Sequence, residues 1–168
     1  MTDTIELTCA NNGLTKTADV LEHNDKYIKC VVEGTQIAMW DKPPIAEVSV
    51  NGKTHYKKEI TASVEEPISI EFEDTLEEGK NYDLVIKRSG KTDGQTVVNE
   101  KGDILKDQIL HIKKIEIDEI DIGALIFEGI YRPEYPEPWA SQQTQQGIEL
   151  PDTIKNSPSM GHNGTWTF

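Results

Sequence analysis

Apolar and polar residues alternate with a period of two along most of the chain. The alternation is clear over residues 5–9, 27–32, 68–72 and 82–86. A period of two puts successive side chains on opposite faces of an extended strand, whereas a helix repeats about every 3.6 residues. The pattern therefore predicts an all-β protein.

Turn residues separate the predicted strands. Asn51-Gly52 lies between residues 47–50 and 53–56, and this pair tolerates positive φ at both central positions of a tight hairpin turn. A Glu-Glu-Gly-Lys loop, residues 77–80, joins strand 68–72 to strand 82–86. We expect a hairpin at Asn51-Gly52, and we expect strands 68–72 and 82–86 to be antiparallel neighbours.

The segment from residue 109 to residue 122 changes the phase of its alternation twice. A shift of one residue turns every later side chain to the opposite face of a sheet, and a β-bulge or a bend restores burial. We expect bends near residues 113–114 and 118–119. Bent strands that pass between sheets are common in sandwiches, so the pattern predicts an antiparallel, jelly-roll-like β-sandwich.

The last 38 residues differ from the rest in composition. Five of the eight prolines lie there, together with a polar, glutamine-rich run. Proline cannot donate to a strand ladder, which favours an extended, irregular arm. Its aromatic residues are costly to leave in water, which predicts partner-binding roles for Tyr131, Tyr135, Trp139, Trp166 and Phe168. We expect a sandwich domain over residues 1–130 and a docking arm over 131–168; the alternative is an arm that wraps its own sandwich.

Composition and charge exclude several classes of function. The chain has 168 residues, 36% of them apolar, and a formal net charge of −13. That charge would repel a phosphate backbone, so we expect no nucleic-acid partner. No stretch of about 20 apolar residues is present, and the first ten residues lack signal-peptide organisation, so we expect no membrane insertion. Cys9 and Cys30 lack CxxC spacing; we interpret both as buried apolar residues, with a redox pair as the alternative.

The sequence contains no recognised catalytic motif: GxSxG, HExxH, P-loop, GxGxxG and paired CxxC are all missing. We therefore expect no enzymatic activity and no cofactor. His111 occupies one of the positions that alternate with the apolar residues of its strand, so we expect it at the surface or rim.

Two groups of residues are candidates for ligand binding. Glu116, Asp118 and Asp121 supply the carboxylates that calcium prefers, but their alternation with isoleucine favours a solvated strand face over a metal site. Trp40, beside a diproline, is interpreted as a core residue or, alternatively, as a flat platform for a sugar or an interface.

Three segments of the C-terminal part stand out together: Lys114–Gly123, Tyr131–Trp139 and Gly161–Phe168. With them, residues 104–168 resemble small virion proteins of contractile-tailed bacteriophages, which are similar in outline to carbohydrate-binding modules. This resemblance implies a jelly-roll sandwich with a structural role as a capsid decoration or a tail, baseplate or fibre accessory.

Two main hypotheses follow, and a third is an enzyme of a type that no motif in the sequence identifies. The first is a non-enzymatic virion protein, made in the bacterial host cytoplasm, whose arm binds capsid or tail subunits and which forms homo-oligomers within the virion. The alternative is a carbohydrate-binding module for host glycans, with or without calcium.

Overall fold

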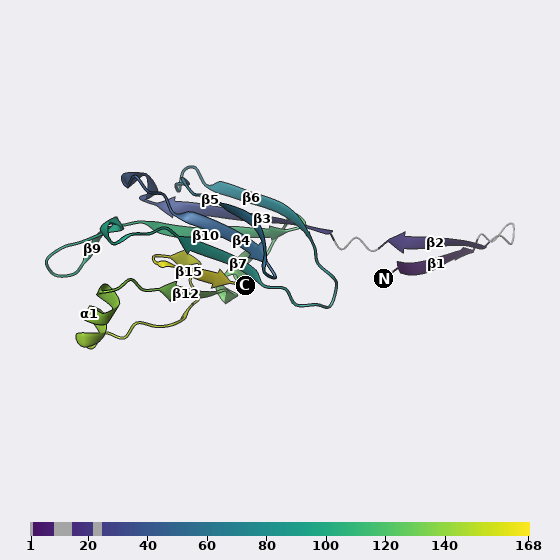
Figure 1. The fold of residues 1–168 in the computed structure, drawn as a ribbon. Helices are drawn as coiled ribbons and strands as arrows, with labels where there is room; N and C mark the ends of the chain where they lie inside the picture. Colours follow the sequence, from purple (N-terminus) through teal and green to yellow (C-terminus); the bar gives the residue numbers. More distant parts are fainter. Residues whose placement is uncertain (1, 9–14, 22–24) are drawn as a thin grey trace.

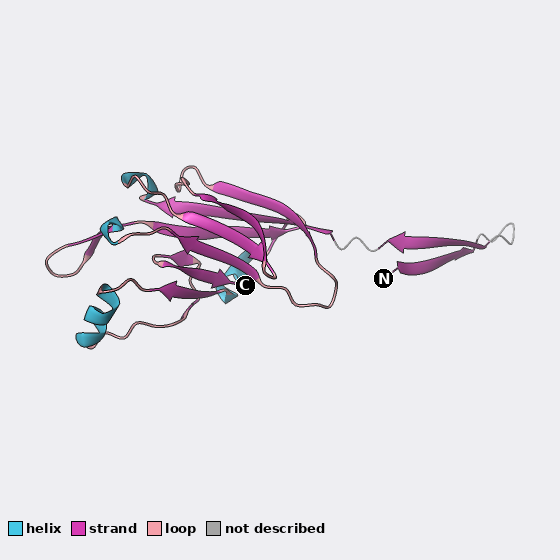
Figure 2. Ribbon diagram, viewed as in Figure 1, coloured by secondary structure: helices cyan, strands magenta, loops and turns pink. Residues whose placement is uncertain are grey.

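The computed structural model describes residues 2–8, 15–21 and 25–168, with side chains from Asp25 onward (Figure 1). Strands dominate it, and its helices are short (Figure 2). None of the helices in the described ranges combines the length and apolar character needed to cross a membrane.

Two antiparallel sheets form the body of the protein. The first has the order β11 (Ile120–Asp121), β10 (Ile109–Ile117), β3 (Asp25–Thr35), β6 (Ile68–Thr75), with β14 (Ser159–Met160) also paired to β10. The second has the order β13 (Ile154–Lys155), β12 (Ile130–Glu134), β15 (Asn163–Thr167), β7 (Leu84–Ser89), β4 (Ile45–Val50), β5 (Lys53–Glu59). The prediction of an all-β, antiparallel sandwich is confirmed.

Smaller elements complete the chain. The remaining strands form two hairpins, β1 (Thr2–Thr8) with β2 (Thr15–Leu21) and β8 (Thr96–Val98) with β9 (Ile104–Asp107). The helices are η1 (Ile37–Met39), η2 (Asp93–Gln95), η3 (Gly123–Glu128) and α1 (Trp139–Gln145). Helix α1 and β9 lie toward the same end of the sandwich, on the left of Figure 1.

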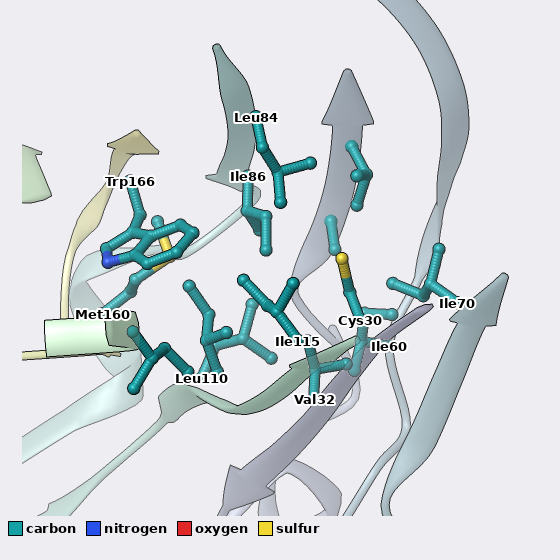
Figure 3. Packing of buried hydrophobic residues seen from close by; sticks show 14 of the residues in the cluster. Cys30, Val32, Ile60, Ile70, Leu84, Ile86, Leu110, Ile115, Met160 and Trp166 are labelled. Atoms are coloured by element: carbon teal, nitrogen blue, oxygen red, sulfur yellow. The ribbon is translucent and has the colours of Figure 1, made fainter. Parts of the chain in front are cut away.

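The core lies between the two sheets (Figure 3). Burial alternates along β3 and β4, as the period of two requires. Cys30 is 0% exposed, which confirms its expected place as a small buried residue. Burial raises the pKa of its thiol to about 12, so Cys30 is protonated at neutral pH. Cys9 lies outside the described residues.

The predicted hairpin at Asn51-Gly52 is confirmed. Val50 pairs with Lys53, and Asn51 and Gly52 have φ values of 48° and 84°. Positive φ at both central residues twists the turn in the same sense as the strands. Asparagine and glycine adopt this geometry at low cost, which is why the local sequence determines the hairpin.

Both expected irregularities of the segment 109–122 are present. The register between β10 and β3 shifts between Ile112 and Lys114, so the bulge keeps Ile112 and Ile115 buried at 1% and 0% exposure. The second irregularity is a full hairpin, with Ile117 paired to Ile120. After this reversal Ile122 packs against the core, whereas Ile120 is 71% exposed, so burial is restored only in part.

Strands β6 and β7 are not neighbours, which corrects the expectation from their connecting loop. Strand β6 pairs with β3 in the first sheet, and β7 lies between β15 and β4 in the second. The loop therefore crosses from one sheet to the other. Glycine-containing loops serve hairpins and sheet crossings alike, so the local sequence could not distinguish the two.

The expected C-terminal arm is not confirmed. Residues 131–168 supply β13, β14 and β15 and all of β12 except Ile130; β14 pairs with β10 in the first sheet, and β15 lies inside the second. Tyr131 and Trp166 are 2% and 0% exposed, and Trp139 begins a helix instead of an extended segment. Alternation along β15 turns Gly164 and Trp166 inward. The free energy gained by burying the large Trp166 side chain favours a strand inside the sheet, although the C-terminal segment is rich in proline.

We expect Trp166→Ala to lower the free energy of unfolding by about 3–5 kcal/mol, because it leaves a large cavity between the sheets. The exposed aliphatic Ile104, 63% exposed, provides the control: Ile104→Ala should change stability by less than about 1 kcal/mol. Urea denaturation followed by circular dichroism measures both. Equal stability of Trp166→Ala and the wild type would show that the C-terminal strand is not part of the core.

Candidate functional site

Three aromatic side chains meet beside helix α1. Tyr135 follows β12, Trp139 begins α1, and His162 lies between β14 and β15. The ring centroids are 6.1 Å apart for Tyr135 and Trp139, 5.1 Å for Tyr135 and His162, and 5.5 Å for Trp139 and His162. These distances fall within the range of favourable aromatic pairs. We call these three residues the aromatic cluster.

Hydrogen bonds to the backbone hold the base of the aromatic cluster. The Tyr131 hydroxyl donates to the His162 carbonyl at 2.6 Å and accepts from the His162 N–H at 3.0 Å. The Tyr135 hydroxyl donates to the Pro151 carbonyl at 2.6 Å. Trp139 rests on Tyr135 and His162, yet it remains 37% exposed. The arrangement presents an indole ring to solvent in a fixed position.

Two charged residues, Lys91 and Asp107, lie close to the His162 segment. Burial, and secondarily Lys91, lowers the pKa of the His162 imidazole, so the ring is neutral at pH 7. The Lys91 ammonium donates to Asp107 at 2.5 Å and also to the Gly161 carbonyl. Asp107 in turn accepts from the Thr96 hydroxyl at 2.8 Å. These bonds tie the His162 segment to the start of β8 and the end of β9.

A buried arginine supports this end of the sandwich. Arg88 on β7 is 0% exposed; its guanidinium donates to the Met160 carbonyl and to the backbone and side-chain oxygens of Gln108 at 2.8 and 2.9 Å. Burial lowers its pKa to about 10, against the opposing effects of Tyr131 and Asp107. The group is therefore still cationic at neutral pH.

The same polar network reaches Trp40. Gln95 and Gln108 both donate to the Lys42 carbonyl, at 2.7 and 3.0 Å. The Trp40 indole N–H donates to the Gly94 carbonyl at 3.0 Å. Trp40 is half-buried, and its polar edge is engaged within the protein. Trp139 is more exposed than Trp40, so of these two tryptophans Trp139 is the better candidate for a flat surface that contacts a ligand.

The five aromatic residues expected to bind a partner occupy different environments. Tyr131 and Trp166 are core residues, and half-buried Phe168 stacks on Trp166 with centroids 6.1 Å apart. Tyr135 and Trp139 are the members that reach the aromatic cluster. Sequence reasoning missed His162, because no local motif marks it and its position depends on the pairing of β12 with β15.

The acidic residues considered for calcium do not converge. Glu116 pairs with Lys29 and Lys114, whereas Asp118 accepts from the Tyr27 N–H at 2.9 Å and pairs with Lys26. Asp121 accepts from the Gly123 N–H at 2.8 Å. Within the described ranges, no three acidic, histidine or cysteine side chains are grouped so as to hold a metal ion. Each carboxylate is instead engaged locally.

A shallow hollow lies along α1. It has a volume of about 530 Å³ and is lined by Glu137, Ala140, Ser141, Thr144 and Gln145. Its hydroxyl, amide and carboxylate groups both donate and accept hydrogen bonds. At about 100° per residue, Ser141, Thr144 and Gln145 share one face of α1, whereas Trp139 lies on roughly the opposite face and does not line the hollow.

No family model matches the sequence, and no curated protein matches it. Two solved structures are similar in fold. One is a selenomethionine form of vCBM60, described with two families of calcium-dependent carbohydrate-binding modules; it has 10% identity and a TM-score of 0.49 over 85% of this chain and 89% of that one. The other is vCBM60 in complex with galactobiose, with 10% identity and a TM-score of 0.47 over 84% and 96% of the respective chains.

We expect Arg88→Met to destabilise the protein by about 2–4 kcal/mol, because it leaves buried carbonyl acceptors without donors. Arg132, which is exposed on β12, provides the matched control, and Arg132→Met should cost less than about 1 kcal/mol. Urea denaturation compares the two. A stabilised Arg88→Met would show that the cost of burying the charge exceeds the gain from its hydrogen bonds.

His162 should make the stability of the protein pH-dependent. Because its pKa is lowered in the folded state, protonation favours the unfolded chain, and stability is lost as the pH falls below the ordinary histidine value of about 6.5. We expect His162→Gln to lose less stability than the wild type between about pH 7 and pH 5. Thermal melts across this range measure the difference, and parallel curves for the two proteins would contradict it.

Proposed function

We propose that this protein is a non-catalytic carbohydrate-binding module and that Trp139 is its sugar-stacking residue. The observation that carries the proposal is the exposure of Trp139 on a base formed by Tyr135 and His162. A sugar ring has an apolar C–H face, which packs on a flat aromatic ring and removes apolar surface from water.

Preorganisation supports this role. The Tyr135 hydroxyl is bound to the Pro151 carbonyl, and the His162 backbone is bound to Tyr131. The platform therefore loses little conformational freedom when a ligand binds, and less of the stacking energy is offset by ordering.

The polar hollow along α1 does not enter this proposal, because its lining residues lie on the helix face opposite Trp139. The proposal requires no calcium, since the carboxylates first considered for it are engaged in local hydrogen bonds and ion pairs.

The virion role is the second candidate function. It rests on the resemblance of residues 104–168. Of the five residues expected to bind a partner, Tyr135 and Trp139 are the two that belong to the aromatic cluster, so this function would use the same surface as sugar binding. Exposed tryptophan and tyrosine also anchor protein interfaces. The two functions make different demands: a sugar is bound by the isolated protein, whereas assembly requires capsid or tail subunits.

We expect the isolated protein to bind members of an oligosaccharide array, and Trp139→Ala to weaken that binding at least about tenfold. Phe127, an exposed aromatic residue outside the aromatic cluster, provides the matched control, and Phe127→Ala should bind as the wild type does. Calorimetry with the best array ligand gives the affinities.

Two further arms of this experiment separate the alternatives. Trp40→Ala should retain binding; its loss, with Trp139→Ala unaffected, would move the platform to Trp40. The array is read with calcium and with a chelator, and the two readings should agree. Silence on the array under both conditions would contradict the carbohydrate-binding proposal and favour assembly.

A further inference from the structure

The sequence contains three asparagine–glycine pairs, and the structure places two of them in different surroundings. Asn51-Gly52 forms the turn between β4 and β5, whereas Asn163-Gly164 begins β15. The third pair, residues 12 and 13, lies outside the described residues. Asparagine is chemically labile before glycine, because glycine has no side chain to shield the backbone nitrogen that attacks the asparagine amide.

The reactive groups of the Asn51-Gly52 pair are free. Both residues are exposed, and a Cβ built on Gly52 would meet no atom within 4 Å apart from its chain neighbours. In the part of the chain that the structure describes, neither the Gly52 N–H nor the Asn51 side-chain amide has a hydrogen-bond partner, since Val50 and Lys53 close the turn. The Asn51 side chain can therefore rotate toward the Gly52 nitrogen.

The Asn163-Gly164 pair is held in place. The Asn163 side-chain oxygen accepts from the Lys91 N–H at 2.9 Å, and its amide nitrogen donates to the Lys91 carbonyl at 3.1 Å. Gly164 is buried between β12 and β7, and a Cβ built on it would lie 2.2 Å from the Arg132 carbonyl oxygen. A ring between Asn163 and Gly164 can form only if both Lys91 hydrogen bonds break and the strands separate.

We propose that Asn51 is a site of spontaneous covalent modification in the folded protein and that Asn163 is not. The Gly52 nitrogen loses its proton to solvent base and attacks the carbonyl carbon of the Asn51 side chain. A new carbon–nitrogen bond forms, the bond to the side-chain nitrogen breaks, and that nitrogen takes up a proton and leaves as ammonia. Water then opens the succinimide ring to aspartate or isoaspartate, so water is the only co-reactant.

The modification changes the charge and the shape of the β4–β5 turn. Either product adds a carboxylate to a hollow of about 200 Å³ that Asn51 lines together with Lys53 and Asp74. Asp74 already pairs with Lys53 at 3.8 Å and with His55 at 2.7 Å. Aspartate tolerates positive φ as asparagine does, whereas isoaspartate inserts a methylene group into the backbone of a two-residue turn. The site is independent of Trp139 and of the proposed sugar binding.

Peptide mass mapping of the full chain tests the proposal. The tryptic peptide 30–53 contains Asn51 as its only asparagine, and peptide 156–168 contains Asn163 together with Asn156, which fragmentation distinguishes. In the folded protein we expect Asn51 to deamidate at least about tenfold faster than Asn163, which reacts only after its strand opens. The reaction should be faster at about pH 9 than at about pH 6, because the attacking nitrogen must lose its proton.

Two controls make the result decisive. In urea that unfolds the chain, Asn51 and Asn163 should react at similar rates, because the dipeptide is the same. The variant Asn51→Asp should show no mass gain in peptide 30–53, and circular dichroism checks that it is folded. A mass gain that persists in this variant would assign the reaction to Gln36, the amide residue that remains in that peptide, and would overturn the proposal.

Two further outcomes would also overturn the proposal. Similar rates for Asn51 and Asn163 in the folded protein would show that the dipeptide alone decides the reaction. Reaction of Asn51 in urea but not in the folded protein would show that the turn protects it. Failure of sugar binding leaves these results unaffected.

Discussion

The buried guanidinium of Arg88 is the interaction on which the candidate site depends. Arg88 leaves β7 in one sheet and donates to Met160 and Gln108, which border the other sheet. A buried cation is costly unless its hydrogen bonds are made. The three hydrogen bonds that Arg88 makes therefore link the two sheets at this end and hold the chain at Met160. The Arg88 Nε has no hydrogen-bond partner in the described part of the protein, so the carbonyl acceptors on the remaining nitrogens provide its compensation.

The position of the aromatic cluster follows from that constraint. Met160, held by Arg88, is two residues from His162, and His162 in turn is bound through its backbone to Tyr131 on β12. Tyr135 and Trp139 follow directly from β12 along the chain. The exposed indole is thus connected to the core through strands and a buried polar network instead of a long free loop. This is the rigidity that an aromatic binding platform requires.

The chemistry of the exposed surface differs from place to place. The aromatic cluster offers rings packed at 5.1 to 6.1 Å from one another, with Trp139 still 37% exposed. A flat apolar ring of this kind is the surface on which the proposed stacking of a sugar depends. A net charge of −13 disfavours contact between copies of the chain over most of the surface.

Local sequence determined the features that depend on neighbouring residues alone. The alternation identified the strands, Asn51-Gly52 the hairpin, and the phase shift near residue 113 the bulge, because turn geometry and side-chain parity are local. Tertiary pairing decided the rest: it placed β6 and β7 in different sheets, buried Tyr131 and Trp166, and brought His162 to Tyr135 and Trp139. It also engaged Glu116, Asp118 and Asp121 with separate partners. A strand's partners are chosen by the packing of the whole core, and no short stretch of sequence contains that information.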